Sequence, residues 1–124
     1  MIRKPLLLLL LPLLIAGCTT VTNLTSRNQP RNAEGLYLVE AAWATRQATI
    51  KPETIKPYVV VGHETYPMKP TPLASNRWEA LVPVPNEKDS IVYRFKFDFE
   101  RRTVPEPLPD SVMSDAFRLD IFER

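Results

Sequence analysis

Ten prolines spread between residues 52 and 109 restrict the fold of this chain more than any other feature of its sequence. Proline removes a backbone donor and clashes with the preceding helical turn, so hardly any window of helix length is uninterrupted. The stretches between the prolines are short and rich in Val, Ile, Tyr, Phe and Trp, which favour strands. We therefore predict strands at residues 36–44, 48–50, 58–62, 78–84, 91–99 and 116–122.

Two of these predicted strands alternate between apolar and other side chains, as a half-buried antiparallel strand does. Their apolar faces consist of Ile91, Tyr93, Phe95, Phe97 and Phe99 in one strand and of Phe117, Leu119 and Ile121 in the other. Six or seven short strands at this spacing are typical of two packed sheets. The sequence thus predicts a single all-β domain, an antiparallel sandwich of about seven strands over residues 35–124.

The N-terminal segment has the pattern of a targeting peptide over residues 1–17. Arg3 and Lys4 precede an apolar stretch at residues 6–15, which is too short to span a membrane, and small residues precede Cys18. The run from Leu14 to Cys18 resembles the lipobox of bacterial lipoproteins, in which the cysteine is acylated and becomes the first mature residue. The alternative is an ordinary cleaved secretory peptide. Thr19 after the cysteine resembles the sorting pattern for the outer membrane.

Charge and composition change once this segment is removed. Two of the 16 basic residues leave with it, so the remainder carries 14 basic and 14 acidic groups. No basic cluster exceeds Arg101–Arg102, which argues against nucleic acid as a partner. Cys18 is the only cysteine, so the domain must fold without a disulfide. Residues 18–34 are polar and predict a lipidated cysteine followed by a flexible tether.

A family resemblance emerges between residues 57 and 100. Its elements are a strand that ends in Gly62, an apolar Met68 a few residues later, Trp78 at the opening of the next strand, and a Tyr-x-Phe-x-x-Asp strand from Tyr93 to Asp98. Together they resemble the immunoglobulin-like modules that bind glycogen. The resemblance implies an immunoglobulin-like sandwich in which Trp78 is a buried core residue.

The sugar-stacking tryptophans of that family have no counterpart here. One follows the strand-ending glycine and the other lies in the turn after the Tyr-x-Phe-x-x-Asp strand, and this chain has tryptophan at neither position. Tyr66 is the nearest residue to the first and, in a predicted loop between Thr65 and Pro67, is the best candidate ligand contact. Packing of Tyr66 over a proline is the alternative. Trp43 is a second candidate, although a core position is the alternative for it.

The sequence offers no pattern that predicts catalysis. His63 is the only histidine and has no companions at metal-ligand spacing. The serines have no Gly-x-Ser-x-Gly context, and no pair of carboxylates stands out for acid and base chemistry. We therefore expect no enzyme, catalytic residue, metal or cofactor.

Two functional hypotheses remain. The first is an envelope lipoprotein, anchored on the periplasmic side of the outer membrane, that binds a protein partner through a sheet face or an edge strand. The alternative is a glycan-binding module that contacts polysaccharide or peptidoglycan through Tyr66 and Trp43. The missing stacking tryptophans favour the first.

Overall fold

The computed structural model describes residues 19–45 and 48–124. Ten strands and one short 3-10 helix (η2, Pro52–Thr54) make up this part of the chain. The strands are β1 (Thr19–Asn23), β2 (Asn28–Pro30), β3 (Leu36–Thr45), β4 (Lys56–Val61), β5 (Glu64–Pro67), β6 (Lys69–Pro70), β7 (Arg77–Pro83), β8 (Ser90–Arg101), β9 (Leu108–Met113) and β10 (Phe117–Phe122). None of the described residues forms a helix long and apolar enough to cross a membrane.

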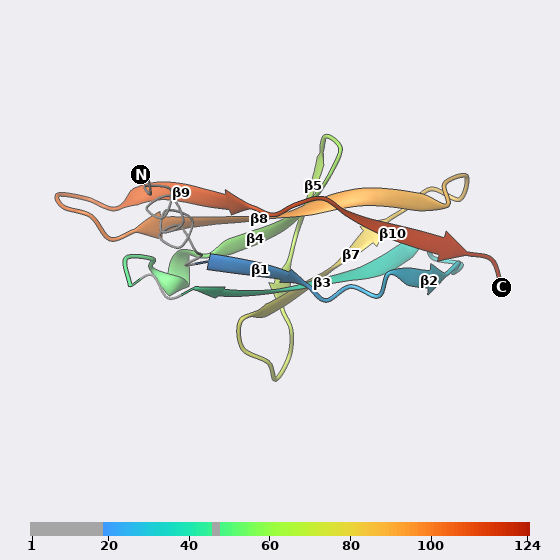
Figure 1. Cartoon of the computed structure of the whole chain (residues 1–124), viewed down its shortest axis with the longest axis horizontal. Helices are drawn as coiled ribbons and strands as arrows, with labels where there is room; N and C mark the ends of the chain where they lie inside the picture. Colours follow the sequence, from blue (N-terminus) through green and yellow to red (C-terminus); the bar gives the residue numbers. More distant parts are fainter. Residues whose placement is uncertain (1–18, 46–47) are drawn as a thin grey trace, which may run out of the picture.

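The strands form two sheets, which are stacked as a sandwich (Figure 1). One sheet has the order β1-β3-β7-β6 and the other β2-β10-β8-β4-β5, with β9 paired to β8 as well. All pairs are antiparallel except β2 with β10. In the immunoglobulin fold, strands A, B, E and D share one sheet in that order. Here β1, β3, β7 and β6 take these four places. The predicted fold class is therefore confirmed.

The core lies between the inner faces of the sheets and contains no buried polar or charged residue among those described. The predicted apolar face of β8 forms its centre, since Tyr93, Phe95 and Phe97 are each at most 1% exposed. Trp43 of β3 packs on Phe97 with ring centroids 4.7 Å apart. Alternation along β8 thus fixes which sheet face is buried, because a one-residue shift would reverse it.

The domain extends further toward the N-terminus than the predicted start at Gly35, because β1 from Thr19 onward belongs to it. Residues 19–30, assigned to a flexible tether by their polar composition, form two strands: β1 pairs with β3, and β2 pairs with β10. The Asn23 amide lies 2.9 Å from the hydroxyl of the buried Tyr93 and so satisfies it. Gln29 donates to the Leu38 carbonyl at 2.9 Å. Backbone pairing and these polar contacts order a segment that contributes little apolar surface.

Five of the six predicted strands are present, and the sixth is corrected. Residues 48–50 form no strand; Ile50 makes only an isolated bridge to Arg101. The segment instead leads into η2, where Pro52 supplies a favourable helical φ. The short strands β5 and β6 and the proline-containing β9 were not predicted from the sequence. Gly62, at φ 60°, makes the turn between β4 and β5.

Candidate functional site

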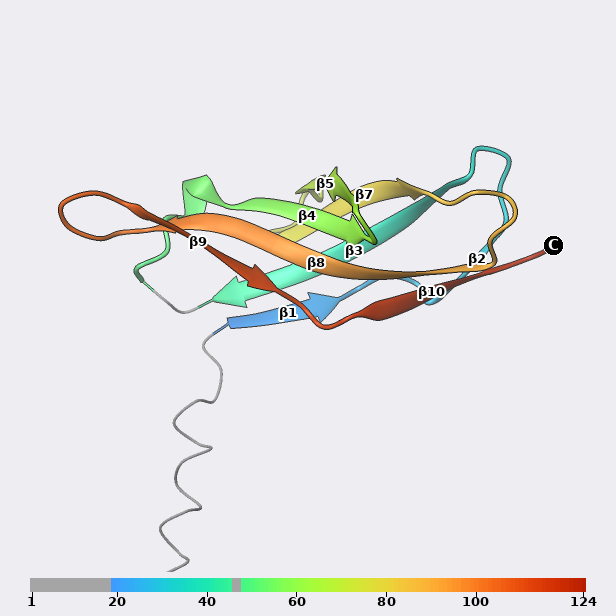
Figure 2. The ribbon, with the colours of Figure 1, turned by 90° about the horizontal axis from the view of Figure 1, so that it is seen from above.

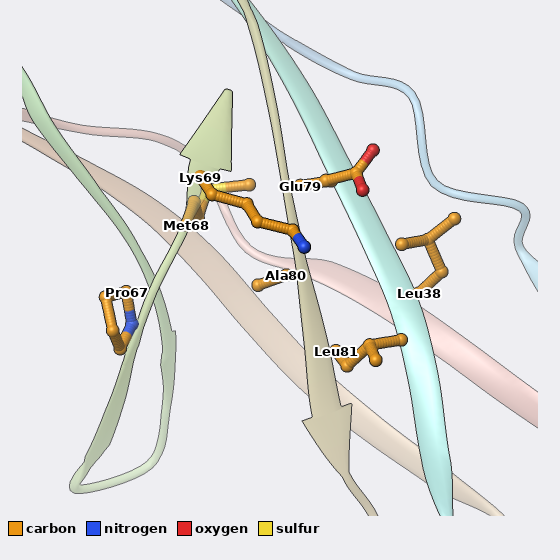
Figure 3. A pocket seen from close by; sticks show the side chains of 7 residues that line it. All are labelled: Leu38, Pro67, Met68, Lys69, Glu79, Ala80 and Leu81. Carbon is orange, nitrogen blue, oxygen red and sulfur yellow. The ribbon is translucent and has the colours of Figure 1, made fainter. Parts of the chain in front are cut away.

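An apolar groove of about 400 Å³ lies where β5 leaves one sheet and β6 joins the other, beside β7 (Figure 3). Its lining residues come from four strands and the residue between β5 and β6: Leu38, Pro67, Met68, Lys69, Glu79, Ala80 and Leu81. Met68 is 8% exposed and anchors the crossing, because its backbone N–H donates to the Pro57 carbonyl at 2.9 Å. Pro67 at the end of β5 and Lys69 at the start of β6 therefore flank a buried residue at the point where the chain passes from one sheet to the other.

The groove continues into an apolar patch on the outer face of the β3–β7 pair. Leu36 faces Pro83, and Leu38 faces Leu81, across the two strands. Leu38 and Leu81 are 38% and 57% exposed. Neighbouring exposed apolar side chains of this kind are a mark of a binding surface, whereas a single one is not.

One edge of β7 is open beside the groove. β6 pairs only with Trp78 and Glu79, so the part of β7 from Ala80 to Pro83 has no strand partner on that edge among the described residues. In an antiparallel ladder, alternate residues direct their N–H and C=O groups to opposite edges. The groove therefore combines apolar side chains with unpaired backbone donors and acceptors, the two components that recognise an extended peptide.

Charged side chains stand at the rim. Lys69 and Glu79 are paired in register across β6 and β7, and Figure 3 shows Lys69 extending across β7. Neither forms an ion pair with another described residue. Glu79 also faces Glu40 of β3, whose carboxylate lies 3.8 Å from the Arg77 guanidinium. The rim thus presents one cation and one anion with their charges available to a ligand.

The two ligand contacts predicted from the sequence, Trp43 and Tyr66, lie in different environments in the structure. Trp43 is 2% exposed and packs between Phe97 and Phe99, so the role of Trp43 as a sugar contact is contradicted by its burial. Its indole Nε1 has no hydrogen-bond partner in the part of the chain that the structure describes. Trp78 faces inward as predicted but stays partly exposed, with its ring edge-on to Phe97 at 5.4 Å.

Tyr66 lies on β5 rather than in a loop and is half-buried against the core. It lines a shallow depression of about 450 Å³ with residues of the segments 33–35 and 83–86, including Glu34 and Asn86. Trp43 lines a different cavity, of about 400 Å³, near Ile50 and Arg102. The two predicted contacts therefore belong to separate cavities.

The remaining predicted positions are placed as follows. Cys18 and the targeting segment 1–17 lie outside the described residues. His63 is exposed in the turn between β4 and β5. No group of three or more metal-ligating side chains occurs in residues 19–45 and 48–124.

The groove was not among the sites predicted from the sequence, but one signal for it exists. Leu36 and Leu38 alternate with the buried Tyr37 and Val39, which makes β3 apolar on both faces. A strand of this kind at the middle of a sheet with a polar outer face is unusual.

Comparison of the chain with protein-family models, with characterised proteins and with solved structures found no match.

Proposed function

We propose that this chain is a lipid-anchored protein of the bacterial envelope that binds an extended segment of a protein partner in the groove beside β7. The observation that supports it best is the open edge of β7 from Ala80 to Pro83, which adjoins an apolar groove of about 400 Å³. Four strand residues span roughly 13 Å, enough for a short added strand. The partner's apolar side chains would contact Leu38 and Leu81.

The lipid anchor is the second part of this proposal. It is supported by the lipobox-like run that ends at Cys18. Two or three acyl chains, at about 0.8 kcal/mol for each buried methylene, anchor a protein stably. An anchored module acts as a binding surface held near the membrane, and it needs no catalytic group to do so.

A site-specific crosslinking experiment tests the groove. A photoreactive amino acid replaces Leu81 in the full-length protein, and illuminated native envelopes are searched for adducts by mass spectrometry. Val92 of β8 provides the matched control, because it is 56% exposed against 57% for Leu81 but lies in the other sheet. We expect a defined protein adduct from position 81 and none from position 92.

Two further measurements separate this proposal from its alternatives. Leu81→Asp should abolish capture of the crosslinked partner, whereas Val92→Asp should not. Equal capture by both variants would refute the groove. Calorimetry with glycogen oligosaccharides and peptidoglycan fragments at millimolar concentration should give no heat of binding. Saturable binding that disappears in Tyr66→Ala would favour the glycan alternative, with the depression beside Tyr66 as its site.

A further inference from the structure

The first described residue, Thr19, is already part of the sandwich. It pairs with Thr45 at the end of β3, so β1 starts one residue after Cys18. Consecutive Cα atoms are about 3.8 Å apart, so an acyl group on Cys18 would be attached directly beside the domain. This inference rests on the lipid anchor of the proposed function. It concerns how the domain itself meets the bilayer.

Three loops leave the strands on the side of the sandwich where β3 ends and β1 starts. They are the segments 48–55 and 102–107, at the end of the molecule, and 71–76, which projects from its side (Figure 1). The Arg102 N–H donates to the Thr49 carbonyl at 2.6 Å, and the Trp43 N–H donates to the Asn76 carbonyl at 3.0 Å. Ile50, Asn76 and Arg102 line a single cavity. Figures 1 and 2 both show the start of β1 at the same end as the loop between β8 and β9, with the C-terminus at the opposite end.

Two of these loops carry fully exposed apolar side chains at their tips. Leu73 and Val104 have relative exposures of 109% and 96%, the two largest among the exposed large hydrophobic residues described. Leu73 also has a φ of 62°, an unfavourable backbone conformation for a residue other than glycine. Leu108, the first residue of β9, adds a third apolar side chain that is 56% exposed.

The composition of these tips suits the boundary between lipid headgroups and acyl chains. Pro72, Pro105 and Pro107 are exposed and lack an N–H group, which reduces the backbone polarity that insertion would remove from water. Segment 71–76 contains no charged residue, and segment 102–107 contains only Arg102 and Glu106. An exposed arginine in this position is suited to lipid phosphates.

The opposite end of the sandwich has a different surface. Its connections are the segments 31–35, 62–63 and 84–89, whose exposed residues include Glu34, His63, Glu87, Lys88 and Asp89. None of these three segments contains an exposed large hydrophobic residue. The apolar loop tips are therefore confined to the side of the sandwich at which the chain would be anchored.

We infer that this side docks onto the bilayer, with Leu73 and Val104 inserted at the headgroup boundary and Arg102 at the phosphates. The acyl chains supply the affinity, and the loop tips fix the orientation of the domain. Burial of one Leu-sized side chain changes a partition equilibrium by about tenfold or more. Two insertions are therefore enough to keep the domain docked most of the time.

Single spin labels on the lipidated full-length protein test this orientation. Acylated Cys18 has no free thiol, so a cysteine introduced at position 73, 104 or 86 is the only labelling site. Asn86 is an exposed residue of the opposite end and serves as the matched control. The protein is placed in phosphatidylethanolamine–phosphatidylglycerol vesicles, and accessibility of each label to a water-soluble nickel reagent and to oxygen is measured.

We expect the aqueous accessibility at positions 73 and 104 to be about tenfold lower than at position 86, with higher accessibility to oxygen. Leu73→Asp should restore aqueous accessibility to a label at position 104, whereas Val92→Asp, a change at an exposed residue of the other sheet, should not. Equal aqueous accessibility at all three positions in acylated protein would overturn the docking but leave the anchor intact. An unmodified Cys18 in the mass spectrum would overturn the anchor and the docking together.

Discussion

Trp43 provides the sharpest test of the core, because two opposing energies act on its side chain. The indole is 2% exposed, and its ring centroid lies 4.7 Å from that of Phe97 and 5.4 Å from that of Phe99. Removing the ring as Trp43→Ala should lower the free energy of unfolding by about 3 to 5 kcal/mol, the usual cost for a buried aromatic residue. A domain of this size has little stability to spare, so this variant should melt early or not fold.

Trp43→Phe should have a much smaller effect. The variant keeps one aromatic ring against Phe97 and loses the remaining indole atoms, at a cost of about 1 to 2 kcal/mol in burial and cavity energy. It also removes the Nε1–H group, which is buried without a hydrogen-bond partner among the described residues, a situation that costs roughly 1 to 3 kcal/mol. The two terms oppose each other, so the net change in unfolding free energy should lie between a loss of about 1 kcal/mol and a gain of about 2 kcal/mol.

Urea unfolding followed by fluorescence measures both variants, since the chain has only two tryptophans and Trp78 remains as the reporter. Trp78→Ala is the control for an inward but half-exposed ring, and it should cost less than Trp43→Ala because less of the ring is buried. A loss for Trp43→Phe as large as that for Trp43→Ala would refute the reasoning. It would mean that Nε1–H has a partner or that the full indole is required for packing.

Three further predictions concern the anchor, a polar junction and acid stability. Cys18→Ala should abolish acylation and release the protein from membranes, and mass spectrometry of an unmodified Cys18 at the mature terminus of the parent would contradict the anchor. Arg31 donates to Glu123, to Asp89 and to the Lys88 carbonyl. Arg31→Lys should therefore lower the melting temperature more than Arg118→Lys, because the Arg118 guanidinium has Asp120 as its one hydrogen-bond partner among the described residues. The hydrogen bond from Arg101 holds the pKa of Asp110 below its ordinary value of 3.8, with the Ser111 N–H contributing. Because the folded-state pKa is the lower one, this stabilisation is present above about pH 4 and is lost as the pH falls through the folded-state pKa. Asp110 is 43% exposed, so Asp110→Asn should cost at most about 1 kcal/mol at pH 6 in urea titrations, and a difference that persists at pH 2 would contradict this assignment.

The strands that the sequence predicted are those whose state is decided locally. In β8 the apolar residues alternate over nine positions from Ile91 to Phe99, and this pattern fits only one face of a sheet. β1 has a single large apolar residue, Val21, among threonines and Asn23. Its strand conformation results from pairing with β3, a contact between segments that the local pattern does not reveal.

The positions of the two tryptophans and of the groove depend on neighbours that are distant in sequence. Both tryptophans face inward, but the ring of Trp43 packs on two described rings, those of Phe97 and Phe99. The ring of Trp78 packs on Phe97 alone among the described rings, and Trp78 also lines an open cavity beside Pro57 and Pro70, which leaves it partly exposed. The groove likewise requires the register that brings Leu38 opposite Leu81, and only long-range pairing sets that register.

The start of the domain at Thr19 changes what an anchor at Cys18 would accomplish. A tether would let the domain sample many orientations, whereas a strand that begins one residue after the anchor restricts both distance and tilt. β7 begins at Arg77, next to the loop that carries Leu73, and its open edge starts at Ala80. Three residues of strand correspond to roughly 10 Å, so a docked domain would present the open edge close to the bilayer but clear of the lipid. The two proposals together therefore define the partner: its binding segment must be accessible in an extended conformation near the membrane surface. A module on a flexible tether would not restrict the partner segment to that height above the bilayer.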